Sequence, residues 1–248
     1  MKRVKATVSY DGTDFAGYQF QPNMRTVQSV IDKALVKLHK DKSIYSVASG
    51  RTDAGVHAYG QVIHFDTPLS LTPDRWRMAL NVLLPKDVRV VDVEFVDEEF
   101  HARYSATGKT YMYKWSRSEI QSPFERNYVV HLGKWHPDVE RMREAATYFI
   151  GTHDFTSFCS SKTATASKVR TVRELTVVEI GEELIMTIEG DGFLYNMVRT
   201  IAGMLFAVGI GWNEPSDMKE MIEAKDRKKV GKTAPAHGLY LMNVTYDS

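Results

Sequence analysis

The chain has 248 residues, of which 43% are hydrophobic, 25% charged and 11% aromatic, and its formal net charge is +1. This composition is typical of a soluble globular protein with one large domain or two small ones, and the charge is too low for indiscriminate nucleic-acid binding. No apolar run reaches the length of a membrane span, no signal-peptide pattern opens the chain, and the single cysteine, Cys159, excludes an internal disulfide and favours a reducing, cytoplasmic setting.

In residues 1–103, apolar residues recur with the spacing of strands in some segments and of helices in others. Alternation indicates strands, and apolar spacing behind a capping threonine or a Thr-Pro pair indicates helices. The expected elements are a strand from Val4 to Tyr10, a helix capped by Thr26, strands over 43–48 and 61–65, a helix opened by Thr72-Pro73, and a strand over 88–96. This β-α-β-β-α-β order predicts a ferredoxin-like unit.

Residues 104–248 repeat the order. The expected elements are a strand over 107–117, a helix over 138–149 stopped by Gly151, strands over 169–180 and 183–189, an apolar helix over 193–208, and a closing strand over 239–246. We therefore predict an α+β fold of two tandem ferredoxin-like halves, 1–103 and 104–248, with mixed or antiparallel sheets.

An insertion is expected at about 209–238, because this segment fits neither unit. It carries a short helix from Pro215 and a group of cations, and it suggests a binding flap. The cations are Lys225, Arg227, Lys228, Lys229 and Lys232, and a second group comprises Lys162, Lys168, Arg170 and Arg173. Each group is interpreted either as a solvated face, the commoner case, or as a track for phosphates.

The loop from Ser49 to Ala58 holds an acid, a base and two glycines between two expected strands. Asp53 lies two positions after Arg51 and four before His57. In one interpretation Asp53 only bonds its own turn. In the other, the loop presents an ionised carboxylate beside a cation on a rigid sheet.

Other chemistries find little support in the residue pattern. The eight histidines show no His-x-x-x-His or His-x-His spacing, so we expect no metal site, and no glycine-rich phosphate loop occurs. His64 on a strand face favours a hydrogen-bonded structural role, and Cys159 favours an apolar filler. Asp53 has no second acid in its loop, which disfavours hydrolysis by a carboxylate pair.

Three further residues are candidates to act with Asp53. Tyr111 either packs its sheet or contacts a substrate ring. Arg199 interrupts an apolar helix, where a buried guanidinium needs an anionic partner. Leu239 opens the closing strand in Gly238-Leu-Tyr-Leu241.

The Asp53 loop and several other segments resemble the tRNA pseudouridine synthases of the TruA type. The segment Gly50-Arg-Thr-Asp-Ala-Gly-Val-His-Ala58 is similar to their signature loop, although that family often has lysine where Ala54 stands. The likeness extends in order to Tyr10-Asp-Gly-Thr-Asp-Phe-Ala-Gly17, Phe100-His-Ala-Arg103, Lys109-Thr-Tyr-Met-Tyr113, Phe193-Leu-Tyr-Asn-Met-Val-Arg199 and Gly238-Leu-Tyr-Leu241.

The resemblance implies an isomerase that converts uridine to pseudouridine at positions 38, 39 and 40 of the tRNA anticodon stem-loop. It implies a central basic cleft between the halves, a homodimer and no cofactor or metal. Asp53 would be the catalytic carboxylate, and Arg199 would pair with it, lowering its pKa by roughly 1–3. Tyr111 would stack on one face of the flipped uracil and take the C5 proton, and Leu239 would contact the other face. Arg51 would occupy the space that the flipped base leaves in the RNA. From the two basic groups themselves, we expect Arg170, Lys228 and Lys229 to bind RNA phosphates.

Two other functions stay open on the residues alone. One is a non-catalytic RNA-binding module, since ferredoxin-like sheets also build such domains, although neither half shows their aromatic-rich motif. The other is a nucleoside or N-glycoside hydrolase using Asp53, which would release free uracil.

Overall fold

The computed structural model describes residues 1–40, 42–161, 163 and 165–247. The chain divides into two compact units, Met1–Thr107 with Tyr240–Ser248, and Gly108–Leu239. Both units combine helices with strands, and the pairing is partly parallel and partly antiparallel, which confirms the α+β class. No helix in the described part of the chain is long and apolar enough to cross a membrane.

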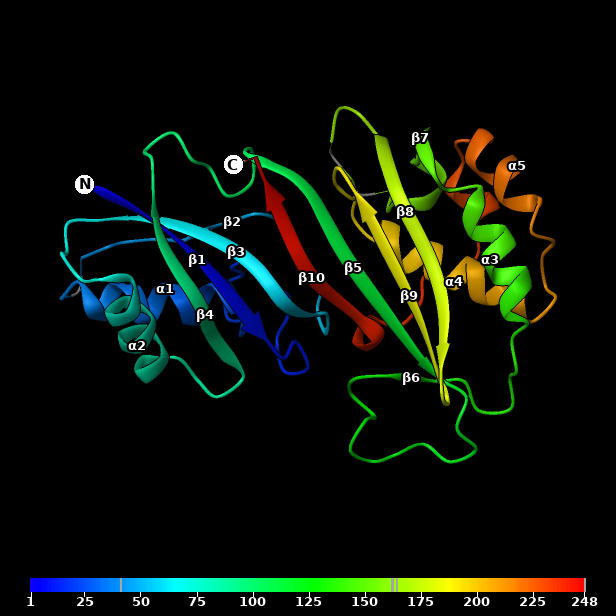
Figure 1. The fold of residues 1–248 in the computed structure, drawn as a ribbon, viewed down its shortest axis with the longest axis horizontal. Coiled ribbons are helices and arrows are strands. Elements are labelled where there is room, and N and C mark those ends of the chain that lie inside the picture. The colour runs from blue at the N-terminus through cyan, green and yellow to red at the C-terminus, as the bar shows by residue number, and fades with distance from the viewer. Residues whose placement is uncertain (41, 162, 164, 248) are drawn as a thin grey trace. The chain divides into compact units, whose positions relative to one another are not determined.

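The first unit is a sheet with two helices on one face. Its strands run in the order β4-β1-β3-β10, with the short β2 beside β3, and α1 and α2 cover one side (Figure 1). The elements are β1 (Lys2–Tyr10), α1 (Val27–Leu38), β2 (Val47–Ala48), β3 (His57–Thr67), α2 (Pro73–Leu83), β4 (Val88–Val96) and β10 (Leu239–Tyr246). Alternate residues of β1 are buried, as the period predicts, and the expected caps Thr26 and Thr72 begin the two helices.

Two features of this unit differ from the sequence-based expectation. The strand expected over 43–48 is reduced to β2, because the Ser46 amide and hydroxyl both donate to Asp32 Oδ1 on α1, at 2.8 and 2.7 Å. The closing strand β10, expected in the second half, pairs in parallel with β3, Tyr240 beside His57 and Leu241 beside Ala58.

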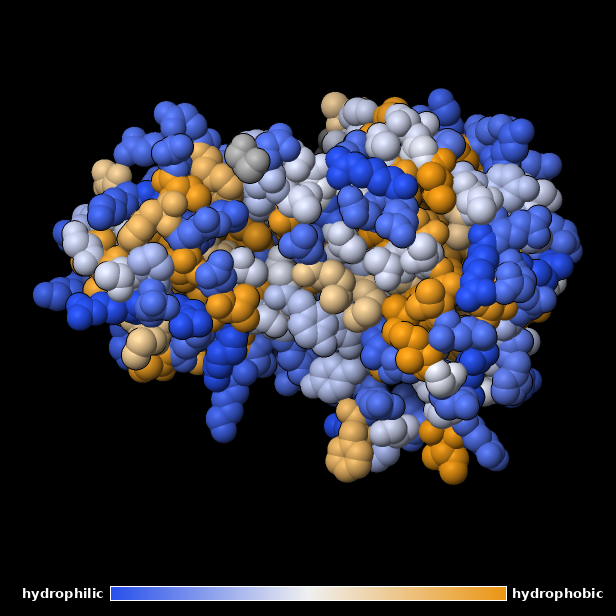
Figure 2. All heavy atoms as spheres, in the orientation of Figure 1, coloured by the Kyte–Doolittle hydropathy of each residue, from blue (hydrophilic) through white to orange (hydrophobic). Residues whose placement is uncertain are grey.

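The second unit is built on an antiparallel sheet in the order β5-β9-β8-β7, with β6 parallel to β5. Its strands are β5 (Ala106–Ser116), β6 (Val130–His131), β7 (Gly151–Asp154), β8 (Val169–Ile180) and β9 (Glu183–Gly190), and its helices are α3 (Val139–Thr147), α4 (Met197–Gly209) and α5 (Asp217–Glu223). Charged and polar side chains cover much of the visible surface of each unit (Figure 2).

The short strands β6 and β7 were not predicted. Gly151 was expected to stop a helix that reaches residue 149. The helix α3 instead ends at Thr147, and Gly151, with φ at +108°, opens β7. Helix α4 begins four residues later than expected, because Asn196 takes the left-handed conformation (φ +65°), which no right-handed helix can contain.

The insertion packs on the second unit and does not form a free flap. The Gly231 amide lies 3.2 Å from Met204 Sδ, and the Ala234 amide donates to the carbonyl of Arg199 at 3.0 Å. The Tyr113 hydroxyl donates to the carbonyl of Pro235 at 2.8 Å. Residues 231–235 are therefore fastened to α4 and β5.

His64 has the structural role that its strand position predicted. Its Nδ1 accepts the amide of Ala102 at 3.0 Å, and the side chain is 5% exposed. Burial lowers the pKa of His64 to about 4, and the proximity of His101 and Arg3 adds to that effect. The neutral imidazole therefore holds the turn after residue 100.

We expect folding to weaken in mild acid for this reason. As the pH falls below about 6.5, the unfolded chain binds a proton at His64 that the folded chain takes up only near pH 4, so stability is full above pH 6.5 and declines between these values. The loss from this group is at most about 3 kcal/mol.

Urea unfolding at pH 7.5 and pH 5 measures this loss. In His64→Gln the amide oxygen can still accept the Ala102 N–H but does not titrate, so the difference between the two pH values should shrink. The exposed His136→Gln serves as the control. An unchanged difference in His64→Gln would contradict the assignment.

Candidate active site

The Asp53 loop lies between β2 and β3 of the first unit. The Val56 amide donates to the carbonyl of Asp53 at 3.1 Å, and Gly55 at φ +78° completes this turn. Thr52 is buried, Asp53 is half-buried and Arg51 is exposed, its Nε donating to Gln19 Oε1 at 3.0 Å. The turn thus places Arg51 and Asp53, which are two positions apart, at the surface of the unit.

The segment after β1 supports this loop by direct backbone contact. A Cβ at Gly12 would overlap the carbonyl oxygen of Val56, and one at Gly17 (φ +100°) would lie 2.9 Å from the carbonyl oxygen of Thr52. The Gly12 amide also donates to Nδ1 of the buried His57 at 3.0 Å. Only glycine allows the two segments to approach so closely.

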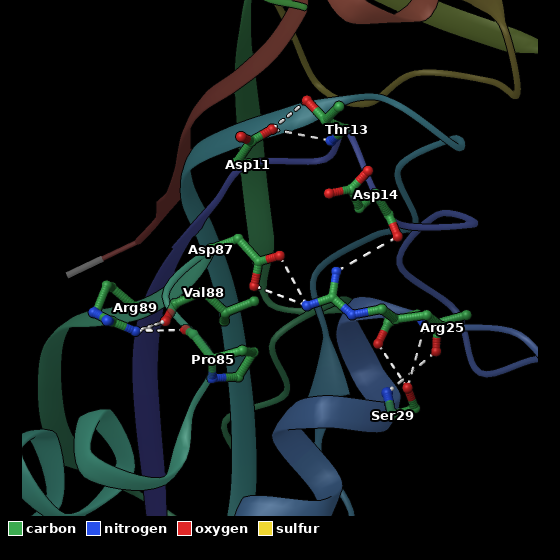
Figure 3. A network of polar contacts seen from close by, with 10 residues as sticks. Asp11, Thr13, Asp14, Arg25, Ser29, Pro85, Asp87, Val88 and Arg89 are labelled. Atoms are coloured by element: carbon green, nitrogen blue, oxygen red, sulfur yellow. Dashed lines mark hydrogen bonds and ion pairs between the residues drawn. The ribbon is translucent and has the colours of Figure 1, made fainter.

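The supporting segment is itself anchored to Asp87, the residue before β4. The Arg25 guanidinium binds both carboxylate oxygens of Asp87, at 3.0 and 2.8 Å (Figure 3). The same guanidinium lies over the Phe15 ring, 4.0 Å from its centroid. The Asp11 amide donates to the Asp87 carbonyl at 3.0 Å. An ion pair and a backbone hydrogen bond to Asp87 therefore hold the segment that supports the Asp53 loop.

In the second unit, Tyr111 and Arg170 lie around the turn that follows β9. Tyr111 on β5 is 8% exposed, and its ring meets the edge of Phe193 with centroids 5.3 Å apart. The Arg170 side chain passes the backbone of Gly192, next to Phe193. Phe193 thus packs against the ring of Tyr111, and a cation lies near the same turn.

Arg199 is held by groups that the sequence alone did not identify. Its Nε donates to the carbonyl of Ala234 at 2.9 Å, and its Nη1 donates to Asn196 Oδ1 at 3.2 Å. The left-handed backbone of Asn196 leaves its side chain free from capping α4, so the amide serves the guanidinium instead. Arg199 therefore has a fixed direction on α4.

Leu239 is buried at the end of this unit, 5% exposed, directly after Gly238, whose missing side chain makes room for the Tyr113 ring. Burial raises the pKa of Tyr113, and the charge of Arg199 opposes that shift. Tyr113 thus stays neutral and structural.

Two cations of the insertion, Lys225 and Arg227, have partners within the second unit. Lys225 pairs with Asp154 at 3.3 Å, and Arg227 donates to the Val230 carbonyl and to Thr233 Oγ1. Lys228, Lys229 and Lys232 are exposed. Lys228 and Lys229 are two of the predicted RNA contacts, and Lys162 of the second basic group lies outside the described residues.

The predicted residues thus fall into two sets. Arg51 and Asp53 share one loop of the first unit, whereas the second unit carries Tyr111, Arg170, Arg199, Leu239, Lys228 and Lys229. Among the residues that the structure describes, no group of three or more His, Cys, Asp or Glu side chains could hold a metal ion.

Comparisons with known proteins agree on one family. A family model for tRNA pseudouridine synthase matches residues 6–105 and 145–247. The tRNA pseudouridine synthase A of Bacillus pumilus (strain SAFR-032) is 55% identical over 247 residues, which cover 99% of this chain and 100% of the relative. The proteins of the same name from Bacillus subtilis (strain 168) and Lysinibacillus sphaericus (strain C3-41) are 55% and 54% identical, with the same coverage.

Among solved structures, a chain in the crystal structure of a Cbf5-Nop10-Gar1 complex aligns with 82% of this chain and 54% of its own length. It has 12% identity and a TM-score of 0.37, and it has no bearing on the assignment. The family model and the full-length relatives decide it: the chain belongs to the tRNA pseudouridine synthases, a family of isomerases.

Proposed function

We propose that this protein converts uridine to pseudouridine at positions 38, 39 and 40 of the tRNA anticodon stem-loop. The observation that supports this function best is the identity of 55% over the full length of relatives named tRNA pseudouridine synthase A, in a chain whose Asp53 loop is held by backbone hydrogen bonds. The two units would form ferredoxin-like halves on either side of a basic cleft that receives the RNA.

Asp53 is the nucleophile in this proposal. The reaction breaks the N1–C1′ bond, turns the uracil, joins C5 to C1′ and releases the C5 proton. It is redox-neutral, and every atom except the exchanged proton comes from the uridine. A carboxylate attacks an anomeric carbon, or stabilises its developing positive charge, in glycoside chemistry.

The other site residues would handle the base. Arg199 would pair with Asp53 and keep it ionised, because a nearby cation favours the carboxylate. Tyr111 would stack on the flipped uracil and accept the C5 proton, with Leu239 on the opposite face. Arg51 would occupy the place of the flipped base, which offsets part of the few kcal/mol of unstacking.

Product analysis on one stem-loop with a single uridine tests the proposal. We expect pseudouridine and no free uracil. Released uracil would identify an N-glycoside hydrolase, and unchanged RNA that is bound by the protein would identify a non-catalytic binding module. Either result would overturn the isomerase assignment for this substrate.

Lys228 and Lys229 are proposed to bind phosphates. Replacing both with Ala should flatten the salt dependence of tRNA affinity, because each phosphate contact contributes about 0.7–0.9 to the slope of log K against log salt. Different tRNAs should weaken alike, since phosphate contacts carry no sequence information.

The exposed pair Lys33 and Lys37 on α1 provides the control, with the same loss of charge elsewhere in the chain. Filter binding across a salt series gives both slopes. Equal slopes for the two double variants would mean that the insertion lysines are only a solvated face.

We also propose a cytoplasmic homodimer in which each tRNA contacts both subunits, since a chain this size has a radius of gyration of roughly 18 Å, much shorter than a tRNA. Mixing Asp53→Asn with a variant lacking the basic side chains of 225–232 should restore activity in verified heterodimers. No recovery would confine each tRNA to one subunit.

A further inference from the structure

A small group of buried polar side chains in the first unit joins the Asp53 loop to the strands β1 and β3. Gln61 is 0% exposed, Ser49 1%, Tyr10 4% and Thr52 8%. Polar groups at such depth cost free energy unless they are hydrogen-bonded. Tyr10 and Gln61 lie on β1 and β3, whereas Ser49 and Thr52 belong to the loop itself, so these buried groups connect the strands with the loop.

Three hydrogen bonds of this group end on the loop. The Tyr10 hydroxyl lies 2.7 Å from Thr52 Oγ1. Gln61 Nε2 donates to the carbonyl of Gly50 at 2.9 Å, and its Oε1 accepts from Ser49 Oγ at 2.7 Å. Side chains of the core strands β1 and β3 therefore hold the three residues Ser49, Gly50 and Thr52.

Thr52 is held at its backbone as well as at its hydroxyl. Its carbonyl oxygen accepts the backbone amide of Tyr18 at 3.0 Å. That carbonyl belongs to the peptide unit that joins Thr52 to Asp53, so this plane cannot rotate without breaking the bond. Burial raises the pKa of Tyr10 to about 12, against the opposing hydrogen bonds to Thr52 and Gln61. Tyr10 is therefore a neutral hydroxyl at physiological pH and keeps its proton.

We propose that Tyr10 is a positioning residue for Asp53 that acts through the hydroxyl of Thr52. This inference rests on the proposed function, in which Asp53 is the nucleophile. The hydrogen bond fixes the residue before the carboxylate, and the reacting atoms must meet within a fraction of an ångström. A misplacement of about 1 Å can cost up to about a hundredfold in rate.

The test compares kcat and KM for pseudouridine formation on one stem-loop, per folded enzyme, in variants of this pair. Tyr10→Phe and Thr52→Val each remove one hydroxyl, and the double variant removes both. Thr52→Ser keeps the hydroxyl. Tyr18→Phe is the matched control, because Tyr18 is equally buried, its hydroxyl has no hydrogen-bond partner among the described residues, and the substitution keeps its backbone amide.

We expect Tyr10→Phe and Thr52→Val each to lower kcat about tenfold or more with KM nearly unchanged, because substrate binding does not depend on the bond. The double variant should be no slower than the slower single variant, since both remove one interaction. Thr52→Ser and Tyr18→Phe should stay within about threefold of wild type.

A Tyr10→Phe enzyme as fast as Tyr18→Phe would overturn the inference, and so would losses that multiply in the double variant. If Tyr10→Phe fails to fold, the comparison of Thr52→Val with Thr52→Ser decides: equal rates overturn the inference and a slow valine variant supports it. A wild-type protein that makes no pseudouridine would overturn the proposed function instead.

Discussion

Asp53→Asn should abolish pseudouridine formation while tRNA affinity stays within roughly tenfold, about 1.4 kcal/mol. The amide has nearly the shape of the carboxylate but cannot attack C1′ or stabilise positive charge there. The half-buried Asp53 is held by backbone bonds of its turn, which the substitution keeps, so folding should change little.

Quantifying pseudouridine after overnight incubation gives the activity, and gel-shift titration gives the affinity. Asp92→Asn, at an exposed position on β4, is the control for loss of one carboxylate. Substantial turnover by Asp53→Asn would remove Asp53 from the chemistry. A large loss of affinity would instead make it a binding group.

Gly203→Ala should lower activity about a hundredfold, because the groups that orient Arg199 would move by about 1 Å. A Cβ at Gly203 on α4 would overlap the carbonyl oxygen of Lys232 and lie 3.3 Å from the amide nitrogen of Ala234. Both are backbone atoms and cannot turn aside. The segment must shift, and the Ala234 carbonyl that accepts from Arg199 shifts with it.

Overpacking of this kind also costs roughly 1–3 kcal/mol of stability, so activity is measured below the unfolding transition. Gly231→Ala is the matched control in the same segment. The new methyl group would meet only Met204 Sδ, at 3.2 Å, the flexible end of a side chain. Equal activity of the two variants would show that the placement of Arg199 does not depend on this contact.

The helices and strands were predicted well where the spacing of apolar residues and the capping residues indicate the same element. The expected strand over 88–96 and the expected strand over 169–180 coincide with β4 and β8, and helix α1 begins after its predicted cap, Thr26. Such elements depend on local propensity and on one apolar face, both of which a single segment contains. The three predictions therefore succeeded without knowledge of the neighbours.

The prediction was wrong where a partner far along the chain decides the structure. Residues 43–46 alternate like a strand, yet the Ser46 amide bonds to Asp32 on α1. The short strands β6 and β7 have no period long enough to detect. A hydrogen bond to a distant side chain, or a strand of two residues, has no local signal.

The candidate site shows the same division. The sequence alone determined that an acid, a base and two glycines share the loop around Asp53, because residue type and spacing are local facts. Only the tertiary structure decided that β10 joins the first unit beside β3 and that residues 231–235 are fastened to α4. It also decided that Tyr10 reaches Thr52 across 42 positions of sequence. These features depend on long-range backbone and side-chain bonds, whose partners are chosen only when the hydrophobic faces pack and exclude water.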